Sequence, residues 1–399
     1  MRSVSNDSQV TASVFERHRR KTLLLIAILP VIVLDCAAAR FLGSRNYDEF
    51  RRPHPYYHHG LLPNRQSLGK WGNGEPYPVY TNSLSMLDEK VREVEPTTSR
   101  HRIVFIGDSY TEGLGVPYEE TFVGLLSRRV DPERVEILNA AVISYCPKLY
   151  YLRTRYLIEE VGLEFDQLYV FIDISDIQDE VLYSDFAPEG LDPVDELLGG
   201  LHRKLRWLSF TYQSVDALRL RRRVKRGMQK YNAELYPPWL SYFWLENIND
   251  EAYADPDFYR IRDSWTLSMS LANNPWTQRG VLSAVEQMEK LVALCRQHGI
   301  RMTIAVYPWP PQVQHRDVDS LQARLWRDFA KMHGLEFIDL FPHLIQDLSY
   351  QEFVARYLLR GDFHWNPEGH KLVDEAVWPH LARSLETGIE SGSDRAHQR

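Results

Sequence analysis

The clearest pattern in the chain is an alternation of short apolar runs and helix-period segments between residues 101 and 386. The apolar runs predict five strands, at Arg102–Ile106, Val135–Leu138, Leu168–Ile174, Ile300–Tyr307 and Leu335–Leu340. The helical segments are Tyr118–Val130, Leu149–Val161, Val281–Gln297, Leu321–Met332 and Pro367–Ala382. Continuous apolar runs are typical of strands that are buried on both faces. Strands that alternate with helices predict an α/β fold, a three-layer α/β/α sandwich around a five-stranded parallel sheet.

Three stretches lie outside this alternation. Residues 40–100 are rich in Pro, Tyr, His and Gly, and we expect a lead-in segment that packs on the main domain, with a short strand at Tyr77–Asn82. Residues 182–276 are an insert, which we expect to be a helical cap. Its basic run Arg219–Lys230 is either a solvated helix face or a contact for anionic lipid or acidic glycan. Residues 387–399 are polar, and we expect a frayed tail.

The N-terminus combines a basic tail, residues 1–21, with an apolar segment, residues 22–39. The segment is long enough for one transmembrane helix, but its end near Ala39 also resembles the small-residue site of a cleaved signal peptide. Asp35 weakens both interpretations, because a carboxylate near the bilayer is costly. The long polar n-region favours an uncleaved single-pass anchor. The basic cluster directly before the segment favours an N-terminus on the inside. The bulk of the chain would then lie outside the cytoplasm, in the periplasm or at the cell surface, and it would be secreted if it were cleaved near Ala39.

Composition narrows the class of protein. With 44% hydrophobic and 25% charged residues, the 399-residue chain has a globular balance, which excludes wholesale disorder and a polytopic membrane protein. The formal net charge of -7 does not favour a nucleic-acid partner. The 3 cysteines are far apart and lack C-x-x-C spacing. His54, His58 and His59 match no helical metal pair, so we expect a surface segment there and no metal or cofactor.

A candidate nucleophile follows the first predicted strand. The sequence reads Phe105-Ile-Gly-Asp-Ser109-Tyr-Thr-Glu-Gly113, so Ser109 lies at the carboxyl edge of the sheet, where ligands bind in open α/β folds. Gly107 allows a tight turn that lets Ser109 project outward, and the next helix presents its free N–H groups to the same point. A serine hydroxyl is a poor nucleophile without a base within hydrogen-bond reach.

The candidate base lies near the other end of the chain, in the loop before the last predicted helix. The sequence there reads Asp362-Phe-His364-Trp-Asn366-Pro-Glu-Gly369-His370. Asp362 and His364 are two residues apart, so they point the same way in extended backbone. The carboxylate can then hold the imidazole Nδ1–H and present Nε2 to the serine. The two motifs together predict a catalytic site of Ser109, His364 and Asp362.

These motifs resemble the SGNH/GDSL hydrolase family, a group of flavodoxin-like α/β/α esterases and related acyltransferases. Gly107-Asp-Ser109 matches its first block, with the frequent extension Thr-Glu-Gly113. The second motif is similar to a D-x-H-W-N-x-x-G variant of its last block, as in the AlgX/AlgJ-like branch that acetylates exopolysaccharides. The resemblance covers roughly residues 101–386 without the insert. It implies that Ser109 attacks an ester carbonyl, His364 moves the proton and Asp362 orients His364, and that an acyl-serine is released to water or an alcohol.

The two middle blocks depart from the family pattern. Ser144 stands where the family has glycine, and Ser175 stands where it has asparagine. Because both positions normally donate to the oxyanion, the resemblance implies an oxyanion hole made by the N–H groups of Ser109 and Ser144 and the Ser175 hydroxyl. Asp173 and Asp176 are acceptors that compete for that hydroxyl. Loss of one such donor typically costs about 10²–10³ in rate.

Three functions therefore remain open at the level of the sequence. The first is a membrane-anchored ester hydrolase, an esterase or deacetylase, acting through an acyl-serine on an acylated small molecule, envelope glycan or lipid. The second is an O-acetyltransferase for cell-envelope polysaccharide, which must keep water from the acyl-enzyme. The third is a catalytically impaired glycan-binding protein, which the substituted Ser144 and Ser175 favour and the intact Ser109 motif opposes.

Overall fold

The computed structural model describes residues 18–41, 50–71, 74–188, 201, 205, 208–215, 218–219 and 265–395. The chain divides into two compact units: residues 1–46 with 191–237, and residues 47–190 with 238–399. Most of the predicted insert at 182–276 and nearly all of its basic run Arg219–Lys230 lie outside the described residues, as does the tail before residue 18. The helical cap therefore stays a prediction.

The second unit is built on one eight-stranded sheet with the order β10-β9-β8-β6-β7-β5-β4-β3. Five neighbouring strands are parallel, namely β6 (His101–Ile106), β7 (Val135–Asn139), β8 (Gln167–Ile172), β9 (Arg301–Val306) and β10 (Glu336–Asp339). Numbered along the chain, these five strands have the order 2-1-3-4-5, which is that of flavodoxin-like folds. The predicted five-stranded parallel sheet is confirmed.

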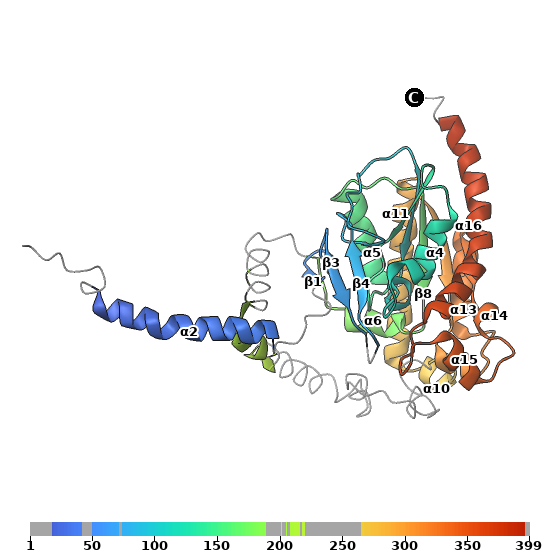
Figure 1. The fold of residues 1–399 in the computed structure, drawn as a ribbon. Helices are drawn as coiled ribbons and strands as arrows, with labels where there is room; N and C mark the ends of the chain where they lie inside the picture. Colours follow the sequence, from blue (N-terminus) through green and yellow to red (C-terminus); the bar gives the residue numbers. More distant parts are fainter. Residues whose placement is uncertain are drawn as a thin grey trace, which may run out of the picture. The chain divides into compact units, whose positions relative to one another are not determined.

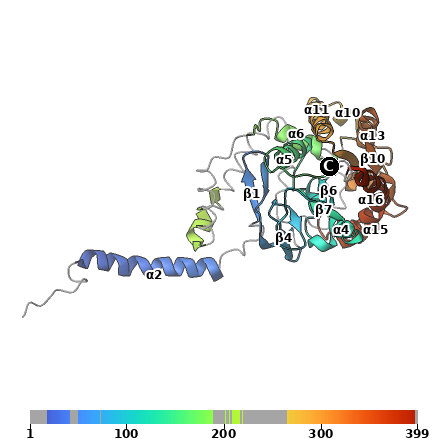
Figure 2. The ribbon, with the colours of Figure 1, turned by 90° about the horizontal axis from the view of Figure 1, so that it is seen from above.

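Helices cover both faces of this sheet (Figures 1 and 2). α4 (Phe122–Arg129) and α16 (Pro367–Arg395) lie on one face, and α5 (Pro147–Glu159), α11 (Pro275–Gln297) and α13 (Leu321–His333) lie on the other. This distribution is what right-handed crossovers impose on the strand order. The shorter helices are α3 (Ser109–Glu112), η1 (Tyr118–Glu120), α6 (Asp176–Leu182), α10 (Met269–Ala272), α12 (Pro310–Gln314), α14 (Phe341–Leu344) and α15 (Tyr350–Tyr357).

The lead-in segment is part of the main sheet. Three antiparallel strands extend the sheet beyond β7, namely β3 (Gln66–Gly69), β4 (Tyr77–Thr81) and β5 (Leu87–Asp88). Before them, β1 (Arg51–His54) and β2 (His58–Leu61) form a separate hairpin. Only β4 was predicted, because strands of two to four residues are too short to show a periodic pattern.

α16 is longer than the sequence predicted. We expected the helix to end at Ala382 and the chain to fray from residue 387, but the helix continues to Arg395. The reason is an apolar stripe at helical spacing: Val377, Leu381 and Leu385 are all buried. This stripe accounts for the helix beyond Ala382 as far as Leu385.

The first unit contains α2 (Arg19–Phe41), whose 23 residues reach a mean hydropathy of 2.5 in an 18-residue window. By length and composition α2 can cross a membrane, although a signal sequence has the same properties. The carboxylate of Asp35 within α2 accepts two hydrogen bonds. The backbone N–H of Thr211 donates to Asp35 Oδ1 at 2.9 Å, and the Thr211 hydroxyl donates to the same oxygen at 2.7 Å. These bonds reduce the cost of the carboxylate in an apolar helix.

Candidate active site

Ser109 is the first residue of α3, directly after β6 in the middle of the parallel sheet. The Asp108 side chain caps this helix by accepting the N–H of Tyr110 at 3.0 Å. The turn requires glycine at position 107, because a Cβ there would lie 2.3 Å from Thr111 Oγ1. A close approach of the backbone therefore sets the direction in which Ser109 leaves the strand.

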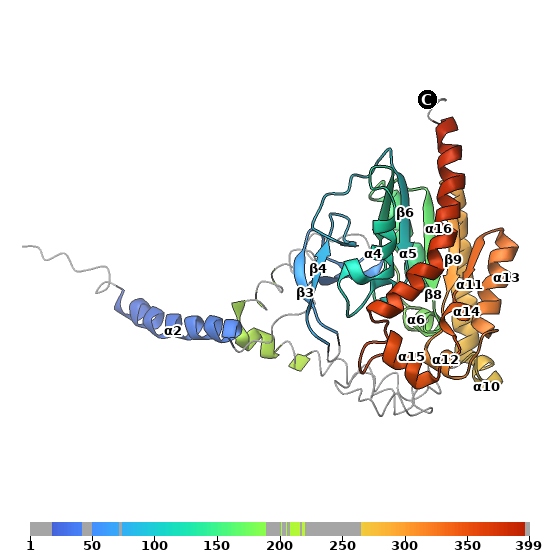
Figure 3. The same cartoon turned by 45° about the vertical axis from the view of Figure 1, so that its right-hand side comes forward.

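Asp362 and His364 reach the same edge from the loop between α15 and α16. α6 and α12, which follow β8 and β9, gather with α15 at one end of the sheet (Figure 3). His364 Nε2 lies 2.9 Å from Ser109 Oγ, and His364 Nδ1 is hydrogen-bonded to Asp362 Oδ1. The backbone N–H of His364 also donates to Asp362 Oδ1 at 2.9 Å. The structure thus brings together three residues that are up to 255 positions apart.

Hydrogen bonds and a glycine fix the loop that carries the histidine. The Tyr110 hydroxyl donates to the Phe363 carbonyl at 2.6 Å, which ties α3 directly to this loop. The Asn366 amide donates to the Leu358 carbonyl at 3.0 Å and so ties the loop to the end of α15. A Cβ at Gly369 would lie 2.3 Å from the Tyr357 carbonyl, so α16 packs there only with glycine. Asn366 and Gly369 therefore have structural roles in the second motif.

His370, which ends that motif, is a buried neutral histidine. Burial, followed by the nearby His364, lowers the pKa of His370 to about 3. Its Nδ1 accepts the backbone N–H of Phe122 at 3.3 Å, at the start of α4. His370 therefore joins α16 to α4 rather than extending the chain of hydrogen bonds at Ser109.

Three acids lie buried beside Ser109: Asp108, Asp173 and Asp176, which have ligand atoms within 4.8 Å of one another. Burial raises the pKa of Asp108 and Asp176 well above the ordinary value, and Asp173 adds to this in both cases. This spacing would suit a metal ion, but hydrogen-bond donors other than Ser109 already occupy four of the six oxygens. These donors are Tyr110 N–H, Ser175, Tyr150, Tyr307 and Trp309. Burial and the mutual proximity of the three carboxyl groups thus favour the protonated form of Asp108 and Asp176.

This cluster predicts an unusual pH dependence of stability. In the folded state Asp176 keeps a proton that the unfolded chain releases above the ordinary pKa of 3.8, so stability falls as the pH rises from there towards the raised pKa. The slope is about 1.4 kcal/mol per pH unit for each retained proton. Asp176→Asn removes this proton and still accepts from Tyr150, so the stability of the variant relative to wild type should increase with pH. Thermal unfolding between pH 4 and pH 8 measures this, and a pH-independent difference would contradict it.

The two expected oxyanion donors are placed differently. Ser144 has a φ of 58°, in the left-handed region that favours glycine, so this backbone conformation is the one that a glycine would supply. Ser175 instead faces Asp173: its hydroxyl and its backbone N–H each donate to Asp173 Oδ1 at 2.7 Å. The Ser175 hydroxyl must therefore leave this carboxylate before it can donate to an oxyanion.

The lead-in segment braces the loop that carries Ser144. Glu112, paired with Arg51 at the start of β1, accepts the N–H of Ile143 at 2.6 Å. On the other side of the same residue, His59 Nε2 lies 2.7 Å from the Ile143 carbonyl and donates to it. Burial lowers the pKa of His59 to about 4, so this imidazole is neutral. The histidine-rich stretch therefore supports the loop next to Ser144.

Some site residues were not found from the sequence. Trp71 donates its indole N–H to Asp362 Oδ2 at 2.7 Å, although the two residues are 291 positions apart. No local motif marks Trp71. Glu112 lies in the Thr-Glu-Gly extension, but no local pattern indicates that its partners are Arg51 and Ile143.

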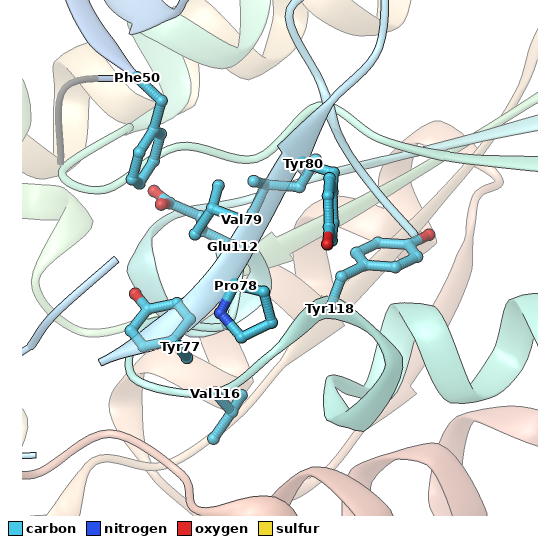
Figure 4. A pocket seen from close by; sticks show the side chains of 10 residues that line it. Phe50, Tyr77, Pro78, Val79, Tyr80, Glu112, Val116 and Tyr118 are labelled. Carbon is cyan, nitrogen blue, oxygen red and sulfur yellow. The ribbon is translucent and has the colours of Figure 1, made fainter. Parts of the chain in front are cut away.

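A small pocket lies between β4 and the segment after α3 (Figure 4). Tyr77, Val79, Glu112 and Tyr118 are among its lining residues. The residues that line it do not include Ser109 or His364. We therefore assign the pocket to the packing of the lead-in segment on the main domain.

The fold and the geometry together define a class of protein: a doubly wound α/β/α sandwich in which a serine, a histidine and an aspartate form one chain of hydrogen bonds. This is the arrangement that serine hydrolases use for acyl transfer. No family model matches the chain, and no curated protein matches it.

Several solved structures are similar to the chain. TesA is 11% identical, with 70% of this chain and 98% of that chain covered and a TM-score of 0.38. A catalytic mutant of Axe2, an acetylxylan esterase from Geobacillus stearothermophilus, is 13% identical, with 70% and 94% covered and a TM-score of 0.36. A GDSL-like lipase from Bacteroides thetaiotaomicron is 11% identical, with 73% and 93% covered and a TM-score of 0.36. Similarity this low assigns no function to the chain.

Proposed function

We propose that the chain is an SGNH/GDSL-type serine ester hydrolase, an esterase or deacetylase that acts on an acylated glycan, lipid or small molecule. One observation carries this proposal: Ser109 Oγ lies 2.9 Å from His364 Nε2, and His364 Nδ1 is hydrogen-bonded to Asp362. The distance is within the range at which a base accepts a proton from its nucleophile. Asp362 and His364 are both buried, which strengthens the interaction between them.

The reaction that this geometry supports has two halves. Ser109 Oγ attacks the ester carbonyl while its proton passes to His364 Nε2, and the leaving alkoxide departs with that proton. Water then attacks the acyl-serine and gives a proton to Nε2, and the serine leaves as a hydroxyl with the proton returned. Asp362 holds Nδ1 protonated, so Nε2 is the nitrogen that faces the serine.

A fluorophosphonate probe tests this assignment directly, because it phosphonylates only an activated serine. We expect wild-type protein to be labelled at Ser109 and the His364→Ala variant to be labelled far more slowly. Absence of labelling in a folded wild-type protein would oppose the proposal and favour the glycan-binding alternative.

The oxyanion hole that we propose uses the N–H groups of Ser109 and Ser144 and, after rotation away from Asp173, the Ser175 hydroxyl. Ser175→Ala should then lower kcat by about 10²-fold with little change in KM, because the bond forms mainly in the transition state. Ser144→Gly should be nearly neutral for activity, because only its backbone is used and glycine readily adopts a φ of 58°. Steady-state kinetics on a simple acetyl ester measures both. Unchanged turnover in Ser175→Ala would remove Ser175 from the hole.

An O-acetyltransferase remains the second candidate, and low solvent access favours it. Only 6% of Ser109 and 2% of His364 is exposed, and a transferase must keep water from its acyl-enzyme. The two activities differ in where the acyl group goes. The experiment that decides between hydrolase and transferase adds a carbohydrate acceptor to the reaction. It measures how much of the acyl group appears as free acetate and how much as acetylated sugar.

We further propose that α2 anchors the chain in the membrane and that residues 40–399 lie outside the cytoplasm. The length and apolar character of α2 support this. Alkaline phosphatase fused after Arg399 should therefore be active in cells. An inactive fusion of full-length protein would contradict this topology.

A further inference from the structure

Asp362 has a hydrogen-bond partner on each of its two carboxylate oxygens. Oδ1 accepts from the Nδ1 and backbone N–H groups of His364, and Oδ2 accepts from the indole N–H of Trp71 at 2.7 Å. Only 7% of Asp362 is exposed, so water contributes little to its solvation. The indole therefore supplies a hydrogen bond to the carboxylate that water would otherwise make.

Trp71 also contacts the imidazole itself. Its ring lies edge-on to the ring of His364, with the centroids 5.3 Å apart and an angle of 88° between the planes. The same side chain thus fixes the carboxylate by a hydrogen bond and limits rotation of the imidazole by contact. Trp71 follows β3 in the lead-in segment, so it is held in place by the antiparallel extension of the sheet.

We propose that Trp71 is a positioning residue for the site: it holds Asp362 in the rotamer that orients His364 towards Ser109. This inference rests on the proposed hydrolase function. Without the indole N–H, Asp362 Oδ2 loses its hydrogen-bond partner. If the carboxylate rotates to find another partner, its hydrogen bond to His364 is broken. The effect falls on the chemical step, because the geometry of proton transfer changes while the substrate surface at Ser109 does not.

The first experiment is Trp71→Phe in the full chain, purified in detergent and assayed with p-nitrophenyl acetate. We expect kcat to fall about 10–100-fold, as for a misplacement of about 1 Å, with KM within about twofold of wild type. Trp276→Phe, at a half-buried tryptophan near the start of α11, is the matched control and should leave kcat unchanged. An unchanged kcat in Trp71→Phe would overturn the inference.

A double-mutant cycle with Asp362→Asn separates positioning from general support of the fold. If Trp71 acts through Asp362, Trp71→Phe should cost less than about threefold once the carboxylate is absent. A full 10–100-fold loss in both backgrounds would overturn the inference. If Trp71→Phe does not fold, β-(3-benzothienyl)alanine at position 71 keeps the bicyclic shape and removes only the N–H, with the same expected result.

Ser109→Ala distinguishes failure of this inference from failure of the proposed function. If Ser109→Ala is inactive and both variants at position 71 are normal, only the role of Trp71 is wrong. If Ser109→Ala retains wild-type turnover, the hydrolase proposal fails, and the positioning role fails with it.

Discussion

Ser109→Ala is expected to lower kcat/KM for ester hydrolysis by at least about 10³-fold. The Ser109 hydroxyl lies 2.9 Å from His364 Nε2. Alanine removes this hydroxyl and changes little else. Residual activity should come from general-base activation of water by His364 and should show no acyl-enzyme burst. Stopped-flow measurements with an activated ester test both the rate and the burst.

Ser99→Ala, in an exposed loop of the same unit, is the matched control and should behave as wild type. Labelling by the fluorophosphonate probe should persist in Ser99→Ala and disappear in Ser109→Ala. Retention of more than about a tenth of wild-type kcat/KM in Ser109→Ala would show that another residue is the nucleophile.

Arg102→Met should give the largest loss of stability. Arg102 is 1% exposed at the start of β6, and its guanidinium donates to Glu136 at 2.7 Å and to three backbone carbonyls. Glu136 keeps its ion pairs with Arg92 and Arg100 in this variant, but the three carbonyls lose their donor. Each buried polar group left without a partner costs about 1–3 kcal/mol. The melting temperature should fall by roughly 10 °C.

Arg100→Met is the control for this effect, because Arg100 also donates to Glu136, at 2.6 Å, but its side chain is 34% exposed. Solvent screens the partly exposed guanidinium of Arg100, so its loss should cost less stability than the loss of Arg102. Equal melting temperatures for the two variants would show that burial of Arg102 does not matter. Both are measured by calorimetry on the full chain in detergent.

The parallel sheet was predictable because its strands are buried on both faces. In β6 and β8, nearly every residue is buried, which produces an uninterrupted apolar run that identifies a strand by itself. The lead-in strands could not be found in this way. β5 has only two residues, which pair with β4, and it joins β7 at the single position Leu87, so it is too short to show a periodic pattern.

The same distinction applies to the candidate site. Ser109, Asp362 and His364 lie in short motifs whose residue types and spacing point to their chemistry, so they could be found from the sequence. Trp71 could not, because its role depends on a contact that only the folded sheet creates. The environment of Ser175 was only partly predictable: Asp173 was recognised as a competing acceptor, but the sequence does not say which way the hydroxyl points.

The wide separation of the site residues has a consequence for the order of events during synthesis. The last strand of the sheet ends at Asp339, before either Asp362 or His364 has been made. A chain growing from its N-terminus can therefore complete all eight strands while Ser109 still has no base. Ser109 and His364 are 255 residues apart, and contacts of such long range form slowly. Under the proposed function, the nascent polypeptide cannot react with esters until the loop before α16 places His364 against Ser109, so the docking of this last part of the chain would switch the chemistry on.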